Sequence, residues 1–195
     1  MHAETVLTDS AALRWVVSER LPAGRLLDAP GDLGVLLREG VIADATLEPY
    51  AVVVRAGAGT SWSHVGERVR RALAFALGDL STWEVEADPD GVLTQIVREV
   101  LAGPVGDLAR SHGGDIEVIT VSDGAVTVEL KGACHGCSAA GETLHERLES
   151  AIRARYPDLR EVRDRSPQPV GRGIWPRLRA GLRADAGPGS RARSS

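Results

Sequence analysis

A change of hydrophobic period around one pair of cysteines constrains the fold of this chain more than any other feature. Apolar and polar residues alternate through residues 125–131 (AVTVELK), which is the period of a half-buried strand. After Cys134 and Cys137, a leucine or isoleucine recurs at every fourth position from Leu144 to Ile152, which is typical of an amphipathic helix. The sequence therefore predicts a strand, a short loop that carries both cysteines, and a helix.

The residues before this strand predict a helix and the first half of a hairpin. Residues 116–121 (IEVITV) favour a strand, and the turn signals HGGD and SDG flank them. A helix is expected from about Val92, with a kink or break at Gly103-Pro104 because proline interrupts the helical hydrogen bonds. A further short strand is expected at 159–162. The predicted order is helix, strand, strand, cysteine loop, helix and strand.

The first half of the chain has the pattern of a small α/β unit without a recognisable chemical site. Residues 32–39 (DLGVLLRE) predict a helix with Asp32 as its N-cap. Residues 41–47 and 50–55 are rich in β-branched side chains and predict two paired strands. An amphipathic helix follows them, and His64 within it is interpreted as a surface or packing residue.

Two further segments divide the chain into domains. Residues 78–91 are acidic and contain Pro89 and two glycines, so they predict a linker. Residues 164–195 are rich in Pro, Gly, Ser and Arg and predict a disordered tail. We therefore expect one domain at 1–77 and a second at 92–163. The predicted fold class is α+β with two small domains, the second with two helices packed on a small β-sheet.

Charge is distributed unevenly along the chain. The formal net charge is -4, but residues 165–195 carry seven Arg and one Asp (+6), which leaves 16 basic and 26 acidic residues (-10) before them. An acidic body repels phosphate backbones, so nucleic-acid binding is not expected. No apolar run reaches the roughly 20 residues that span a bilayer, and the first residues lack the pattern of a signal peptide. The default expectation is a cytoplasmic protein without a membrane contact.

The cysteine loop combines features that stabilise ionised sulfur. Cys134 and Cys137 lie at the predicted N-terminus of a helix, where free amides and the helix dipole favour a thiolate by about 0.3–1 kcal/mol. Gly132 and Gly136 leave space beside a bulky ligand. Two cysteines are too few for a disulfide-stapled scaffold, so we expect them to have a chemical role.

A Cys-x-x-Cys pair by itself is compatible with several kinds of site. A thioredoxin-like redox pair opens a helix within a βαβ unit, whereas this pair follows a hairpin. A zinc site needs four ligands, and the nearest further candidate is the single His145. A four-iron cluster also needs four thiolates, which two copies of the chain together supply. Burial of both cysteines as small hydrophobic residues is the remaining alternative.

Three histidines near the pair are not expected to bind a metal. His135 lies between the cysteines, and the side chains of a two-residue spacer usually point away from a bound metal. His112 and His145 are interpreted as ordinary polar residues. The candidate ligands are therefore Cys134 and Cys137 alone, and no catalytic residue is predicted, because the chain offers no recognisable catalytic constellation.

Residues 92–163 resemble the C-terminal domain of NifU, also called the Nfu domain. The resemblance rests on the segment GDIEVITVSDGAVTVELKGACHGCSAAGETL, with its hairpin, its GACxGC motif and its Thr-Leu helix. Residues 5–77 resemble more loosely the domain that precedes the Nfu domain in many relatives. The sequence departs from the family at 138–140, where Ser-Ala-Ala replaces Pro-Ser-Ser, at the Gly-Pro pair of 103–104, and in the arginine-rich tail.

The resemblance implies an iron–sulfur cluster carrier and not an enzyme. In such a carrier, Cys134 and Cys137 of two subunits hold one [4Fe-4S] cluster in a homodimer, with a [2Fe-2S] cluster as the alternative. An upstream scaffold supplies the cluster, and client apoproteins receive it. Two other functions stay open. One is a thiol-disulfide oxidoreductase with Cys134 as nucleophile and Cys137 as resolving thiol, and the other is a non-catalytic interaction module.

Overall fold

A computed structural model of the chain describes residues 1–132 and 138–165. Within these residues the chain forms two β-sheets and five α-helices, which confirms the predicted α+β class. The predicted ligands Cys134 and Cys137 lie outside the described residues. So does nearly all of the predicted disordered tail at 164–195.

The N-terminal unit is built on a sheet of six strands. The strand order is β1-β2-β5-β4-β3-β6, and every neighbouring pair runs antiparallel. The strand pair expected at 41–47 and 50–55 is confirmed as β4 and β5. The sequence predicts an α/β unit, but the antiparallel pairing makes it α+β. The strands are β1 (His2–Thr5), β2 (Ala12–Val16), β3 (Gly24–Asp28), β4 (Ile42–Glu48), β5 (Ala51–Ala56) and β6 (Glu84–Ala87).

Two helices cover one face of this sheet and close the N-terminal core. α1 (Asp32–Arg38) and α2 (Trp62–Ala76) occupy the predicted positions. The predicted N-cap at Asp32 is wrong, because Gly31 takes the N-cap position with a φ of 66° and the Asp32 carboxylate instead accepts two hydrogen bonds from Arg68. The buried core includes Leu33, Leu36, Leu47, Val52, Val54, Val69 and Leu73.

The segment expected to be a linker, 78–91, is structured for most of its length. Leu80–Thr82 form a short 3-10 helix (η1), and β6 pairs with β3 at the edge of the sheet. The next helix, α3, already begins at Pro89. Three of the four residues of β6 are exposed, so its sequence EVEA lacks the apolar pattern of a buried strand. The linker prediction failed here because an edge strand can be polar on both faces.

The C-terminal unit packs three helices on a sheet with the order β7-β8-β9. The predicted hairpin is confirmed, since β7 and β8 pair antiparallel around a turn at Asp123 and Gly124. β9 lies parallel to β8, close to the strand expected at 159–162. The elements are α3 (Pro89–Ala102), α4 (Pro104–Ser111), β7 (Gly114–Ser122), β8 (Ala125–Gly132), α5 (Ser138–Arg155) and β9 (Glu161–Asp164).

The predicted helix break and the predicted helical stripe are both confirmed. Gly103 ends α3 and caps α4, whose first residue is Pro104, so one expected helix becomes two. On α5, the side chains of Leu144, Leu148 and Ile152 are buried, with exposed fractions of 3%, 1% and 0%. They belong to a second core that also contains Leu93, Ile96, Val97, Ile116, Val126, Val128 and Tyr156.

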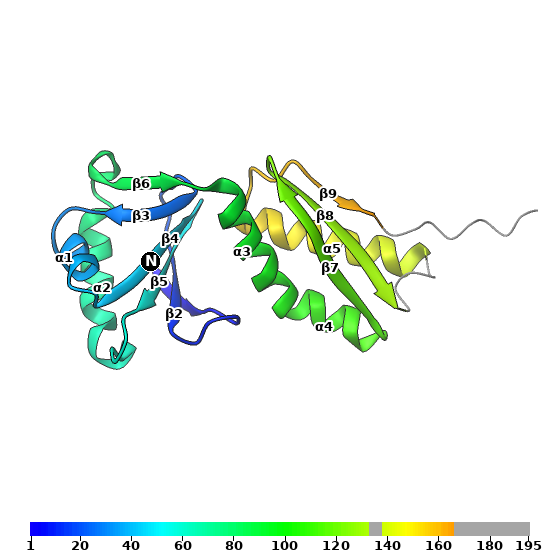
Figure 1. The fold of residues 1–195 in the computed structure, drawn as a ribbon, viewed down its shortest axis with the longest axis horizontal. Helices are drawn as coiled ribbons and strands as arrows, with labels where there is room; N and C mark the ends of the chain where they lie inside the picture. Colours follow the sequence, from blue (N-terminus) through cyan, green and yellow to red (C-terminus); the bar gives the residue numbers. More distant parts are fainter. Residues whose placement is uncertain (133–137, 166–195) are drawn as a thin grey trace, which may run out of the picture.

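The two units lie side by side and are joined where β6 leads into α3 (Figure 1). α1 and α2 lie on the side of the six-stranded sheet remote from the C-terminal unit, whereas α3 lies on the side toward it. The C-terminal end of α5 is near the N-terminal unit, and its N-terminal end is at the far end of the molecule. With 18 residues, α5 spans about 27 Å between these two places.

Candidate functional site

The loop that carries the predicted ligands is bounded by β8 and α5. β8 ends at Gly132 and α5 begins at Ser138, so residues 133–137 connect a strand to a helix N-terminus, as the sequence predicts. Cys134 and Cys137 belong to this loop and lie outside the described residues. Their role as ligands therefore stays a prediction, and the described residues on either side define how the loop is held.

Gly132 holds the loop entrance close against the start of β7. Its φ is 68°, and a Cβ atom at this position would lie 2.5 Å from the carbonyl oxygen of Gly113. Gly132 also pairs with Gly114 across the hairpin. Any side chain at this position would meet backbone atoms and would need an unfavourable left-handed conformation. The end of the hairpin therefore requires this glycine, in addition to any space that a ligand needs.

The helix that follows the loop, α5, is held in place near both of its own ends. Near its start, Leu144 and Leu148 are buried in the C-terminal core. At its end, the guanidinium group of Arg153 donates hydrogen bonds to the carbonyl oxygens of Leu159 (2.5 Å) and Arg160 (3.2 Å). These bonds tie the last turn of α5 to the segment that leads into β9. The cysteine loop thus connects two elements that are each secured by packing.

Charges beside the loop entrance are paired across the hairpin. Lys131 lies opposite Asp115 and forms an ion pair with Glu117. The hydrogen bond and the attraction of Glu117 raise the pKa of Lys131, and Glu129 and Asp115 contribute to the same shift. One ammonium group therefore faces three carboxylates. Among the described residues, this end of the hairpin therefore brings no excess positive charge to the loop entrance.

Comparison with known protein families assigns the C-terminal unit. The family model described as "NifU-like domain" matches residues 97–163. These residues form a NifU-like domain. The matched segment begins within α3 and continues through α4, the hairpin, the cysteine loop and α5 to β9. The family resemblance predicted for 92–163 is thereby confirmed.

Curated relatives that match the chain are named Fe/S biogenesis protein NfuA. The protein of Vesicomyosocius okutanii is 31% identical over 80 residues, which are 40% of this chain and 42% of that protein. The protein of Xanthomonas euvesicatoria pv. vesicatoria is 35% identical over 80 residues, 40% of each chain. The protein of Erwinia tasmaniensis is 33% identical over 76 residues, 38% of this chain and 40% of that protein. The chain thus spans about two fifths of the length of these relatives.

Three described histidines lie on or beside helices, and that they bind no metal stays a prediction. His145 lies on α5 with Nε2 3.7 Å from a carboxylate oxygen of Glu149, one turn later. His112 is exposed at the C-terminal end of α4, and His64 is exposed on α2. His135 lies outside the described residues. Within residues 1–132 and 138–165, no group of three or more His, Cys, Asp or Glu side chains could hold a metal ion, and no helix is long and apolar enough to cross a membrane.

Asp90 supports the hairpin of the NifU-like domain, and the sequence did not predict this role. From the first turn of α3, its carboxylate accepts hydrogen bonds from the amides of Asp123 (3.0 Å) and Gly124 (3.1 Å). Asp123 has a φ of 51°, a conformation that is costly for a residue with a side chain. The available signal was an acidic residue directly after Pro89, which is typical of a helix start.

Proposed function

We propose that this chain is an iron–sulfur cluster carrier. Its NifU-like domain binds a [4Fe-4S] cluster through Cys134 and Cys137 and delivers it to client apoproteins, and the chain itself catalyses no reaction. The observation that carries the proposal is a Cys-x-x-Cys loop between the hairpin and the last helix of a NifU-like domain. The matching relatives, which are named Fe/S biogenesis proteins, support it.

The position of the loop suits cargo that must leave again. Residues on both sides of the loop are fixed, by the close approach at Gly132 and by the buried face of α5. One chain supplies only two of the four thiolates that such a cluster takes. A client thiolate can therefore bind iron as the thiolate of Cys134 or Cys137 leaves and takes up a proton. This exchange changes no oxidation state and needs no catalytic residue.

A second copy of the chain completes the ligand set. Two chains together offer four thiolates, so the cargo bridges a homodimer with twofold symmetry. A [2Fe-2S] cluster also takes four thiolates and is the alternative cargo. An upstream scaffold supplies the cluster, and client apoproteins take it over. We place this exchange in the cytoplasm, where thiols stay reduced, with no membrane or nucleic acid as partner.

The decisive experiment is the metal content of protein prepared without oxygen. We expect a brown protein with broad charge-transfer absorption and about four irons per dimer. Cys134→Ser and Cys137→Ser should each lose the stable cluster, whereas His135→Ala, which changes the same loop but no predicted ligand, should keep it. Colourless protein with stoichiometric zinc, or protein that is colourless and reduces disulfides, would contradict the proposal.

Circular dichroism and urea unfolding separate ligand loss from unfolding in these variants. Because the loop at 133–137 connects elements that are held by their own packing, both serine variants should unfold at the urea concentration of the cluster-free parent. Global unfolding of Cys134→Ser and Cys137→Ser would instead indicate that the cysteines have a structural role.

The oligomeric state tests whether the cargo itself joins the subunits. Apoprotein should be largely monomeric and loaded protein dimeric, because the bonds from iron to four thiolates supply association energy to the folded, loaded state. Light scattering after size exclusion, at matched concentrations, measures this directly. Cys137→Ser should lose cluster and dimer together. A tight dimer without cluster would rule out release by dissociation of the subunits.

A further inference from the structure

The six-stranded sheet turns a polar face toward the C-terminal unit. Along β4, Asp44, Thr46 and Glu48 alternate with Ala45 and Leu47, and only the latter two belong to the N-terminal core. Successive residues of a strand point to opposite faces, so the three polar residues share the face remote from α1 and α2. Such a face is normally left to solvent in an antiparallel sheet. Here α3 and the end of α5 lie over it (Figure 1).

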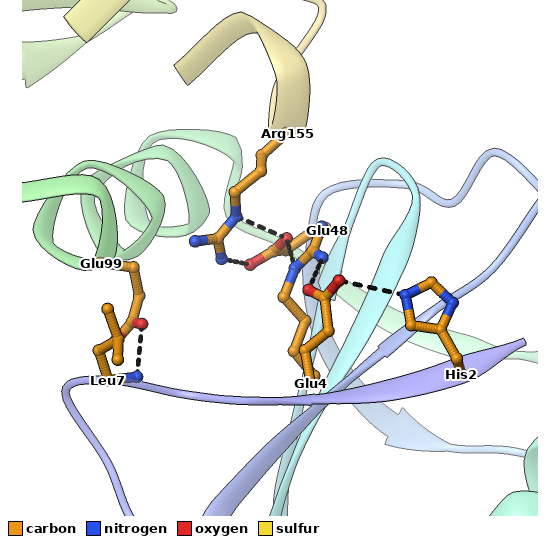
Figure 2. Close-up of polar contacts among 7 residues, drawn as sticks. His2, Glu4, Leu7, Glu48, Glu99 and Arg155 are labelled. Atoms are coloured by element: carbon orange, nitrogen blue, oxygen red, sulfur yellow. Dashed lines mark hydrogen bonds and ion pairs between the residues drawn. The ribbon is translucent and has the colours of Figure 1, made fainter. Parts of the chain in front are cut away.

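Three groups of contacts link the N-terminal unit to the C-terminal unit. The first is an exposed ion pair between Arg20, after β2, and Asp158, after α5, which contributes little because both side chains are open to solvent. The Arg155 guanidinium, at the end of α5, forms an ion pair with Glu48 (Figure 2). Glu99, on α3, accepts hydrogen bonds from the backbone amides of Leu7 (2.9 Å) and Thr8 (2.8 Å) in the loop after β1. Sequence separations of 107 and more than 90 residues show that tertiary structure alone brings these groups together.

The space between the units is a polar cavity and not a second hydrophobic core. Its volume is about 310 Å³, and its lining includes Asp44, Arg55, Arg98 and Glu99. Among the described buried and partly buried hydrophobic residues, Ala23 alone comes from the N-terminal unit and packs with the apolar cluster of the C-terminal unit. Contacts of this composition resemble those between proteins that associate reversibly.

Glu48 keeps a partner whether the units are together or apart. Its side chain is 3% exposed, and a carboxylate at such a position is very unfavourable if it is left unpaired. Arg14, on the neighbouring part of the same sheet, donates a hydrogen bond from Nε to Glu48 at 2.8 Å. Loss of Arg155 therefore leaves Glu48 paired with Arg14. The free-energy cost of leaving a buried carboxylate unpaired, which normally prevents a buried ion pair from opening, is therefore reduced at Glu48.

We infer that the two units separate and rejoin reversibly, with the Glu48–Arg155 ion pair as the latch between them. In the joined state, Glu99 holds the loop at Leu7 and Thr8, and the polar face of the sheet is covered. In the separated state, the charges of this face and of α3 become hydrated and available to another molecule. Asp88, the single residue between β6 and α3, is the hinge, and its amide must release the carbonyl oxygen of Ala23 when the units separate.

Hydrogen exchange at two amides tests this inference without reference to cluster binding. Leu7 and Thr8 donate their amide hydrogens to Glu99, so these amides report on the joined state. Arg155→Gln removes the latch without touching either amide. If the units open as a whole, exchange at both amides should rise by about tenfold, equivalent to about 1.4 kcal/mol.

A matched control removes an arginine whose partner lies within one unit. Arg70 pairs with Glu67 on the same helix, α2, at 2.8 Å. Arg70→Gln should leave exchange at Leu7 and Thr8 unchanged. Amides of the central strand β5 should keep the exchange rate of the parent in both variants, which shows that neither variant unfolds the N-terminal unit.

Salt provides a second test on the unmodified chain. From 0.1 M to 1 M salt, the Debye length falls from about 10 Å to about 3 Å, which weakens attraction between the units. The radius of gyration from small-angle X-ray scattering and the exchange at Leu7 and Thr8 should both rise. If neither changes with salt, and if Arg155→Gln also leaves exchange unchanged, the units form one rigid body and the inference is wrong.

Discussion

The two units of this chain bury a sheet in different ways. The N-terminal unit covers the apolar face of six antiparallel strands with α1 and α2, and its opposite face carries ion-paired side chains. The C-terminal unit packs α3, α4 and α5 against three strands, and its candidate site lies on the loop between β8 and α5. The larger sheet thus carries no predicted chemistry, whereas the smaller one leads into the loop to which the predicted ligands belong.

Two glycines show the same difference on a small scale. Gly40 and Gly132 both have positive φ values, 70° and 68°. Nothing lies within 4 Å of a Cβ atom built at Gly40, whereas one built at Gly132 would lie 2.5 Å from a carbonyl oxygen. A glycine after a helix in the N-terminal unit serves only the turn. The glycine before the cysteine loop serves both the turn and a close backbone approach.

The largest expected effects come from the two cores. Leu47→Ala and Leu148→Ala each remove a side chain that is at most 1% exposed, and each should lower the free energy of unfolding by about 2–5 kcal/mol. Urea unfolding followed by circular dichroism measures this. Iron content on mild heating should fall for Leu148→Ala and stay at the parent level for Leu47→Ala. Equal iron loss in both variants would show that the units unfold as one cooperative body.

Gly132→Ala should destabilise the NifU-like domain by about 1–3 kcal/mol, because it adds a backbone clash to a strained left-handed conformation. The matched variant Gly40→Ala has the strain without the clash and should cost about 1 kcal/mol. The measurement is the urea midpoint of each variant. A larger loss for Gly40→Ala than for Gly132→Ala would contradict the close approach at the loop entrance.

Asp90→Asn should lower the free energy of unfolding of the C-terminal unit by about 1–2 kcal/mol. Each carboxylate oxygen accepts one hydrogen bond from the turn at 123–124, and the variant replaces one of these oxygens with an NH2 group, which cannot accept. Asp107→Asn is the control, since Asp107 also lies in the first turn of a helix and, among the described residues, pairs with the half-exposed Arg110. Chemical unfolding of the two variants side by side gives the difference. Similar losses would mean that helix charge, and not the turn, is what Asp90 stabilises.

A smaller effect is expected at alkaline pH. Burial raises the pKa of Tyr156, with Asp158 and Asp90 contributing in the same direction. The folded state therefore favours the neutral phenol, and this stabilisation is complete below the pKa of about 10 of an unfolded tyrosine. It is lost as pH rises through the folded pKa. Unfolding of the parent and of Tyr156→Phe at pH 9 and pH 11 should show a steeper loss for the parent, and parallel behaviour would contradict it.

The smallest effect is expected for the tail. Truncation after Asp164 removes a segment that carries no predicted ligand, so iron content should equal that of the full chain. A longer truncation after Arg160 also removes β9, the parallel partner of β8, and should lower both stability and iron content. Loss of iron in the shorter truncation would show that the tail takes part in cluster binding.

The sequence by itself determined the pattern of the C-terminal unit. The alternation in β8, the fourfold stripe of α5 and the break at Gly103-Pro104 are all local signals, and the structure has each of them. The motif around Cys134 and Cys137 indicated the NifU-like family in the same way. Local signals suffice here because period, proline and glycine act on neighbouring residues within one element.

Only the tertiary structure decided which elements complete the sheets and where the two units meet. The sequence did not predict β6, which lies within the segment expected to be a linker. An edge strand needs a partner strand but no apolar pattern. The role of Asp90 and the contact between Glu48 and Arg155 were equally invisible, since the partners are 33 and 107 residues apart. A sequence pattern indicates which face of an element is buried. Packing of the whole chain determines which other element or charged side chain covers that face.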